Sequence, residues 1–228
     1  SKGDGNYQIE IVPIIGKEKN SKIESLELKL EGNKLVGKGK YELNGYRKSS
    51  NAYRLGGLNE EKEKRFINAI LTKGNNKFLI DDYQIFDFED KDKPLRIEYA
   101  YNLEDYSKLL GDEIYINLNL DKSYANALID VEKRKLPKKN EYQHLTKQEL
   151  VFELPPSYEI DYLPPNQRFD NELFGFDISY QVKNQKVHQR KEVYLNYLLL
   201  EKENFGTWNE MIKKLSAAYQ EVLILKKK

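Results

Sequence analysis

The chain offers few side chains that could act as catalytic bases or nucleophiles. It has two histidines, His144 and His188, and no cysteine. Acyl-transfer catalysis needs a nucleophile, a base and a group that orients the base. His188 lies among basic and amide residues at 186–191, which is typical of a solvent-facing strand, and His144 lies in the polar stretch 140–147. Neither has a serine in a nucleophile elbow beside it, so we predict no catalytic residue and no enzyme.

Metal and cofactor sites are weakly indicated. The acidic side chains of Asp87, Glu89, Asp90 and Asp92 could present oxygens to Ca²⁺, but the rest of an EF-hand loop is missing, which favours a solvated turn. The glycine pair at 56–57 lacks the lysine and the strand-to-helix context of a glycine-rich phosphate loop. We therefore predict neither a metal nor a cofactor.

Charge and hydropathy narrow the classes of partner. The 38 Lys and Arg residues balance 37 Asp and Glu residues, so no overall field attracts nucleic acid, and none is predicted as a partner. The basic runs at 133–139 and 226–228 are interpreted as a solvated loop and a tail. No run approaches the ~18 apolar residues of a membrane span, and residues 1–6 do not resemble a signal peptide. The chain is predicted to be either cytosolic or, because of its opening residues, the interior of a secreted protein.

Strand patterns fill the first half of the chain. Alternating residues predict strands at 7–14, 23–30 and 35–43, the last two joined by a Gly-Asn turn, and further strands at 78–88 and 95–101. Between them, Asn59 is a candidate N-cap for a helix at about 59–71, and Gly74 follows its end.

A second series of strands follows, at 113–120, 148–154, 176–182, 186–195 and 222–225. Two proline pairs, at 155–156 and 164–165, end strands because proline cannot donate to a ladder. A helix is predicted at about 207–219, because Thr207 and Glu210 have capping-box spacing. Five side chains share one helical face, namely Trp208, Met211, Ile212, Leu215 and Tyr219.

These elements predict a mainly β, β-sandwich-like fold of antiparallel sheets with two packed helices. Charge and proline at 91–94 interrupt the two series of strands. We therefore predict two modules: residues 1–93, β-rich with one helix, and residues 94–228, a β-sandwich with a C-terminal helix.

Several short motifs resemble the region that follows the transglutaminase-like core in large secreted proteins of the Bacteroidetes type. The most specific is a strand entering a Leu-Pro-Pro-x-Tyr corner, with a second Leu-Pro ending the next strand. The resemblance covers the chain from about residue 28, on these segments: Gly37 to Tyr41, Gly45 and Tyr46, Asn51 to Arg54, Asp92 to Leu95, Tyr101, Gly111 to Ile116, Arg134 to Pro137, Glu153 to Pro164, Asn171, Phe174 and Gly175.

The resemblance implies an accessory region of a cell-envelope protein. In that family the catalytic Cys-His-Asp set belongs to the transglutaminase-like domain, which would precede residue 1, and this chain has no cysteine to take that role. The resemblance therefore implies an upstream transglutaminase-like domain as partner, a periplasmic or cell-surface location, and a signal peptide outside this chain.

Three hypotheses about function follow. The first is a non-catalytic accessory or interaction module that flanks a transglutaminase- or protease-like domain. The second is a β-sandwich module that binds an envelope glycan or a peptide, because exposed tyrosines among the 17 in the chain could stack on sugar rings. The third is an enzyme whose scattered carboxylates form a site. An exposed aromatic platform would favour the second, and a deep pocket with converging carboxylates the third.

Overall fold

The computed structural model describes residues 13–228. The chain is mainly β, with 43% of residues in strands and 20% in helices, as predicted. The strand predicted at 7–14 falls almost entirely outside the described residues.

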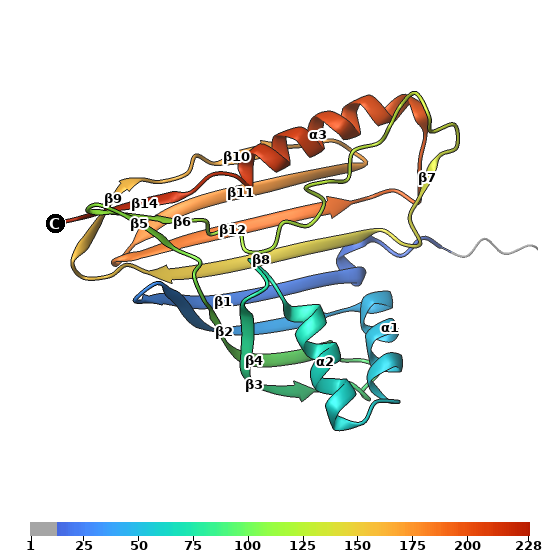
Figure 1. The fold of residues 1–228 in the computed structure, drawn as a ribbon. Helices are drawn as coiled ribbons and strands as arrows, with labels where there is room; N and C mark the ends of the chain where they lie inside the picture. The colour runs from blue at the N-terminus through green and yellow to red at the C-terminus, as the bar shows by residue number, and fades with distance from the viewer. Residues whose placement is uncertain (1–12) are drawn as a thin grey trace, which may run out of the picture.

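One large sheet organises the molecule (Figure 1). Its eight strands lie in the order β10-β11-β12-β8-β1-β2-β4-β3, and their pairings are antiparallel except for the parallel pairing of β1 with β8 at the centre. The strands are β1 (Ser21–Glu31), β2 (Lys34–Leu43), β3 (Phe78–Phe86), β4 (Leu95–Leu103), β8 (His144–Glu153), β10 (Gln167–Phe169), β11 (Phe174–Lys183) and β12 (Lys186–Leu195).

Turn residues fix the two predicted hairpins of this sheet. Gly32, between β1 and β2, has φ +63°, a left-handed conformation that glycine adopts without a steric cost. Asn184 and Gln185, between β11 and β12, also have positive φ values, which matches the turns that join twisted antiparallel strands.

Smaller sheets complete the β structure. The order β5-β6-β14-β9 forms a four-stranded sheet, and β7 pairs with β13. The predicted strand 113–120 is shorter in the structure because the Asn117 side chain accepts from the backbone N–H of Asn119 and starts a turn. These strands are β5 (Lys108–Leu110), β6 (Glu113–Ile116), β7 (Lys138–Lys139), β9 (Tyr158–Tyr162), β13 (Leu199–Leu200) and β14 (Leu223–Lys227).

Both predicted helices are present, and a third one was not predicted. In α2 (Glu60–Leu71) the Asn59 side chain caps the helix by accepting from the Lys62 N–H, 3.0 Å away. α3 (Phe205–Ala218) begins directly after a 3₁₀ turn at Lys202–Asn204, two residues before the predicted cap. Thr207 is therefore already inside the helix, and the predicted capping box is wrong. A second 3₁₀ turn, Lys17–Asn20, precedes β1.

The unpredicted helix is α1 (Gly45–Leu55), which joins β2 to α2. Its buried residues are Lys48 and Leu55. A helix with so little apolar surface has no stripe from which its period can be read.

All three helices and the four-stranded sheet lie on the same face of the large sheet (Figure 1). The predicted apolar stripe of α3 is confirmed, because Trp208, Met211, Ile212 and Leu215 are fully buried. The opposite face of the large sheet, called the open face here, carries no covering layer within residues 13–228.

The predicted boundary between residues 93 and 94 falls in the loop that joins β3 to β4, which are neighbouring strands of the large sheet. Strands from both predicted modules pair side by side in that sheet. The division into modules 1–93 and 94–228 therefore stays a prediction.

Candidate functional site

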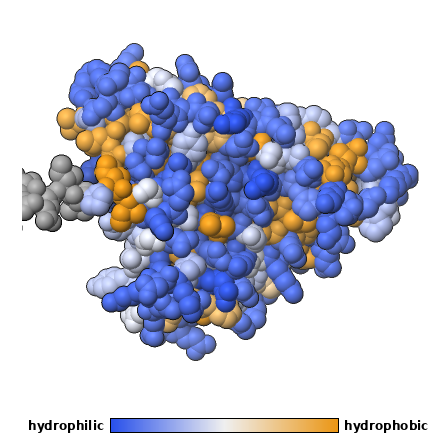
Figure 2. All heavy atoms as spheres, turned by 180° about the vertical axis from the view of Figure 1, so that it is seen from behind, coloured by the Kyte–Doolittle hydropathy of each residue, from blue (hydrophilic) through white to orange (hydrophobic). Residues whose placement is uncertain are grey.

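Charged and polar side chains cover the open face (Figure 2). Their signs alternate across neighbouring strands: Glu192 on β12 faces Lys147 on β8, and Glu27 on β1 faces Lys38 on β2. Opposite charges at directly opposed strand positions stabilise a sheet. The open face is thus suited to contact with water or with another polar surface.

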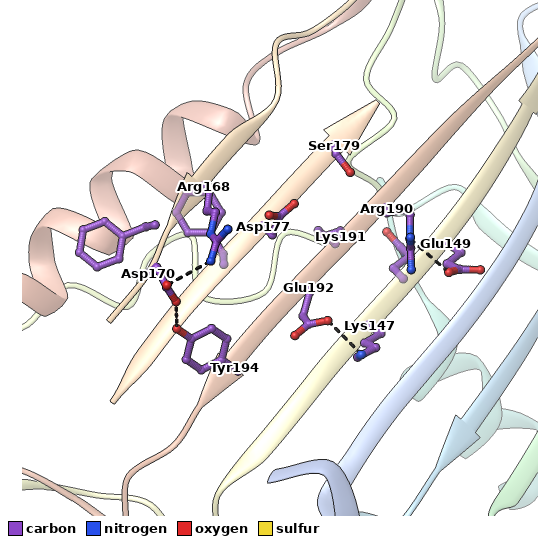
Figure 3. A pocket seen from close by; sticks show the side chains of 13 residues that line it. Lys147, Glu149, Arg168, Asp170, Asp177, Ser179, Arg190, Lys191, Glu192 and Tyr194 are labelled. Carbon is purple, nitrogen blue, oxygen red and sulfur yellow. Dashed lines mark hydrogen bonds and ion pairs between the residues drawn. The ribbon is translucent and has the colours of Figure 1, made fainter. Parts of the chain in front are cut away.

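A groove of about 370 Å³ crosses the open face above β11, β12 and β8 (Figure 3). Two of its ion pairs are cross-strand: Lys147 Nζ lies 3.0 Å from Glu192 Oε2, and Arg190 Nε lies 3.4 Å from Glu149 Oε1.

A third interaction closes one end of the groove. Asp170 binds both Arg168, with an N–O distance of 3.1 Å, and the hydroxyl of Tyr194, which donates to it over 2.6 Å. Gly175 lies beneath this tyrosine, and a Cβ there would come within 2.5 Å of the tyrosine hydroxyl oxygen. The absence of a side chain at this position keeps the tyrosine in place.

Three of the four carboxylates that line the groove are held in ion pairs. Asp177 is the one carboxylate lining it that forms no ion pair with a described residue. Ser179 also lines the groove, and no histidine is among the lining residues. A general base must lie within hydrogen-bond reach of the proton that it removes.

The two histidines lie in different places. His188 is on β12, opposite Val151 and Gln181, and its side chain belongs to the open face, as the sequence indicated for a strand residue facing solvent. His144 begins β8, and its Nε2 lies 2.5 Å from the hydroxyl oxygen of Tyr124, a partner that the sequence did not indicate.

His144 belongs to a row of four rings, called the ring row here: Tyr46, Tyr142, His144 and Tyr124. Consecutive ring centroids are 5.4, 5.8 and 6.2 Å apart. Tyr46 comes from α1 and Tyr124 from the loop after β6. His144 is the first residue of β8, and Tyr142 lies two residues before it. Half of the Tyr46 side chain is exposed, while the other rings are half-buried.

Local structure holds α1 against the start of β8. Asn20 is 1% exposed; its amide donates to the Gln143 carbonyl, and its side-chain oxygen accepts from the Tyr46 N–H. Gly45 has φ +57°, and a Cβ there would lie 2.3 Å from Asn20 Oδ1. Tyr124 also has a positive φ, +69°, which is uncommon for a residue with a large side chain.

Arg47 lies beside the ring row, and no described residue neutralises its charge. Arg47 forms no ion pair within residues 13–228, and its buried Nε has no hydrogen-bond partner there. Burial and this nearby positive charge lower the pKa of His144 to about 4, and burial raises the pKa of Tyr124. The imidazole is therefore neutral at physiological pH, and accepts from the Tyr124 hydroxyl.

A central polar cluster lies beneath the large sheet where β1 meets β8. Glu24 accepts from Lys73 at 2.8 Å, from Tyr99 at 2.7 Å and from Gln148 at 2.9 Å. Burial alone would raise the pKa of Glu24, but the adjacent lysines outweigh it and the pKa is lowered. Since each bond joins a different segment of the chain, this part of the cluster links the two halves of the sheet.

The second part of the cluster is centred on Asp121. Its carboxylate pairs with Lys22 at 2.7 Å, and its backbone carbonyl accepts from Lys191. Lys191 is buried, and burial lowers its pKa to about 8. Burial opposes the ionised form of Asp121, yet the positive charges of the two lysines hold its pKa well below the usual range.

The acidic loop at 87–92 is held by lysines. The Lys48 ammonium donates to the backbone carbonyls of Asp90 and Lys93, and Lys93 pairs with the carboxylates of Asp87 and Asp90. Ammonium groups thus contact the oxygens that a cation would use. Among residues 13–228, no three His, Asp or Glu side chains are placed to hold a metal ion.

The comparison with known families decides where the chain belongs. The pattern of a family described as a domain of unknown function with a solved structure, DUF3858, matches residues 112–225. The chain belongs to this family. No curated protein matches it.

The DUF3858 range runs from the end of β5 almost to the C-terminus, so it contains the whole groove. It also contains Tyr124, Tyr142 and His144 of the ring row, whereas Tyr46 and Arg47 precede it. The ring row therefore lies where the DUF3858 region meets the preceding half of the chain.

None of the described helices is both long and apolar enough to cross a lipid bilayer. The groove and the ring row were not predicted as sites. Their parts are distant in sequence, and the only local signal was the abundance of tyrosine.

Proposed function

We propose that this chain is a non-catalytic interaction module, and that the open face docks a transglutaminase- or protease-like domain of the same cell-envelope protein. The observation that carries the proposal is the groove, in which charges are arranged in pairs and exposed in a fixed pattern. Such patterns give a polar interface its specificity and orientation.

The resemblance to the region after a transglutaminase-like core supports the choice of partner. Its motifs, such as the corner at 154–158, end strands and pack turns, which are architectural tasks. A module of this kind would act by positioning its neighbour at the periplasmic or outer surface.

Docking is tested by supplying the segment encoded directly upstream as a separate polypeptide and measuring association by titration calorimetry at tens of micromolar. The exchange Arg190→Glu with Glu149→Arg keeps an ion pair but reverses the surface pattern, and is expected to weaken binding roughly tenfold. The matched control exchanges Arg65 and Glu61, an exposed pair on α2. Lack of association, or equal loss in both exchanges, contradicts docking at the open face.

The non-catalytic part of the proposal is tested separately. The purified chain is expected to show no transglutaminase, peptidase or esterase turnover, because the hydroxyl that is hydrogen-bonded to His144 is the phenol of Tyr124, and burial raises its pKa and so disfavours its nucleophilic, ionised form. Turnover that persists through repeated purification and in the His144→Ala and His188→Ala variants would contradict it.

One observation favours a second candidate function, the binding of a small ligand. Tyr46 exposes half of its surface while its ring stacks on Tyr142 in the ring row, with a 25° angle between their planes. Rigid, exposed aromatic rings are what sugar rings and peptide side chains pack against.

A further inference from the structure

We infer that the ring row and Arg47 form a binding site for an acidic saccharide, with Tyr46 stacking on the sugar ring and the Arg47 guanidinium binding its carboxylate. This inference rests on the ligand-binding candidate above and is independent of docking at the open face, so the two can fail separately.

The charge of Arg47 sets the chemistry of the ligand. A guanidinium keeps its charge at any physiological pH and favours a planar carboxylate, which it can bind through two parallel hydrogen bonds. The described residues supply no carboxylate partner to Arg47. A bound carboxylate would neutralise its charge.

The other side chains around Arg47 add no second unpaired charge to the site. His144 is neutral at physiological pH, and the raised pKa of Tyr124 keeps its phenol protonated. Lys22 is also close enough to lower the pKa of His144, but it is paired with Asp121. The site therefore suits a ligand that presents one negative group beside an uncharged body.

The rings determine the shape of that body. Tyr46 has one face against Tyr142, which leaves the other available to solvent, and no aliphatic side chain belongs to the row. A pyranose ring presents a flat row of C–H groups that packs on an aromatic face, with hydroxyls at its edge.

The strand pairing argues against an extended peptide as the ligand. His144 lies on β8, which is paired with β12 on one side and lies beside β1 on the other. A peptide could not add here as a further strand, because no free sheet edge is present at this point. A saccharide needs only the side chains.

The geometry is fixed before any ligand binds. Tyr124 is hydrogen-bonded to His144, and Asn20 ties Tyr46 to the residues just before β8. A site whose side chains are already held in place loses less conformational entropy when its ligand binds.

The test titrates the whole chain with a trisaccharide that carries a single galacturonate unit, with the neutral trigalactoside and with a pentapeptide of glutamate, followed by calorimetry and NMR. We expect the uronate to bind and the neutral sugar to bind at least tenfold more weakly, which is about the contribution of one charge-assisted interaction. Arg47→Gln and Tyr46→Ala should each weaken uronate binding by about tenfold.

Matched controls are available in the same helices. Tyr53→Ala removes a tyrosine of α1 that is 88% exposed and outside the ring row, and Arg65→Gln removes an exposed arginine of α2. Both variants should leave the affinity for the uronate within about twofold of wild type, because surface substitutions away from a site usually have small effects. Melting temperatures show that each variant is folded.

A spectroscopic readout locates the ligand. A carboxylate bound to Arg47 should raise the pKa of His144 and shift its ring signals, while those of His188, on the open face, stay unchanged. Three results would overturn the inference: no binding of the uronate, equal binding of both sugars, or Arg47-dependent binding of the acidic peptide alone.

Discussion

At the scale of single residues, lysine ammonium groups hold the acidic loop at 87–92. Lys48 is 7% exposed and is bonded to two backbone carbonyls of the acidic loop. Substitution with methionine keeps the volume but leaves both carbonyls without their donor. Two acidic side chains of this loop, Asp87 and Asp90, form ion pairs with Lys93.

Lys48→Met is expected to lower the free energy of unfolding by about 1–3 kcal/mol, because two part-buried hydrogen bonds from the Lys48 ammonium are lost. Chemical denaturation measures the change. Lys64→Met, at an exposed position of α2, serves as control and should change stability by less than about 0.5 kcal/mol. If the two variants unfold alike, Lys48 does not hold the loop.

His144 predicts a dependence of stability on pH. Its folded pKa of about 4 lies below the ordinary value of 6.5, so the unfolded chain binds a proton more readily than the folded one between these values. The sign is therefore a loss of stability as the pH falls from about 6.5 towards 4. From pH 7 to pH 5 the expected loss is about 2 kcal/mol.

The measurement compares unfolding of wild type and His144→Gln across this pH range. The variant lacks the titrating group, so its stability should fall less steeply, whatever the carboxylates contribute to both proteins. Parallel curves would show that His144 titrates equally in the two states.

At the scale of elements, α3 anchors the DUF3858 half of the molecule. Trp208 is fully buried, donates from its indole nitrogen to the Ala127 carbonyl over 2.7 Å, and meets the ring of Phe174 edge-on at 5.3 Å. Trp208→Ala should cost roughly 3–5 kcal/mol, as large-to-small core changes do.

Lys213→Ala on the exposed side of α3 is the control for that substitution, with an expected change within about 0.5 kcal/mol. Thermal denaturation of both variants decides the matter. A Trp208→Ala melting temperature equal to that of wild type would mean that the helix does not pack as described.

The helices also show what can and cannot be predicted from sequence. α2 and α3 were predictable because caps or apolar stripes repeat at helical spacing, as at Asn59 and at Trp208. α1 buries a lysine, Lys48, and depends on contacts with Asn20 and Gly45 that have no local pattern. The hairpins followed from period-two residues and turn chemistry.

The candidate sites were harder to predict than the fold. The ring row combines residues from α1, a loop and β8, and the Glu24 cluster joins side chains as far as 124 positions apart. Sequence periodicity reports the local surroundings of a residue, whereas these contacts depend on the parallel pairing of β1 with β8, which no turn specifies.

At the scale of the whole molecule, the sheet continues across the limit of the DUF3858 range. Residues 112–225 supply β8, β10, β11 and β12, and the preceding residues supply β1, β2, β3 and β4. The joint is the β1–β8 pairing, and Glu24 on β1 accepts from Gln148 on β8 beneath it. The family region therefore has a sheet neighbour outside its own limits.

From this joint we predict that residues 112–225 alone do not reach the stability of the whole chain. Without β1, the backbone groups of β8 that pair with it lose their partners, the buried amide of Gln148 loses Glu24, and Asp121 loses Lys22. Unpaired buried polar groups and an open strand edge both favour unfolding and aggregation. We expect a broad, weakly cooperative thermal transition for the fragment and a sharp one for residues 13–228. Adding residues 13–111 in trans should restore a sharp transition, because it returns β1 and Glu24 to the joint. A fragment that melts sharply, within a few degrees of the whole chain and without the added segment, would contradict the prediction and would make the DUF3858 range a folding unit of its own.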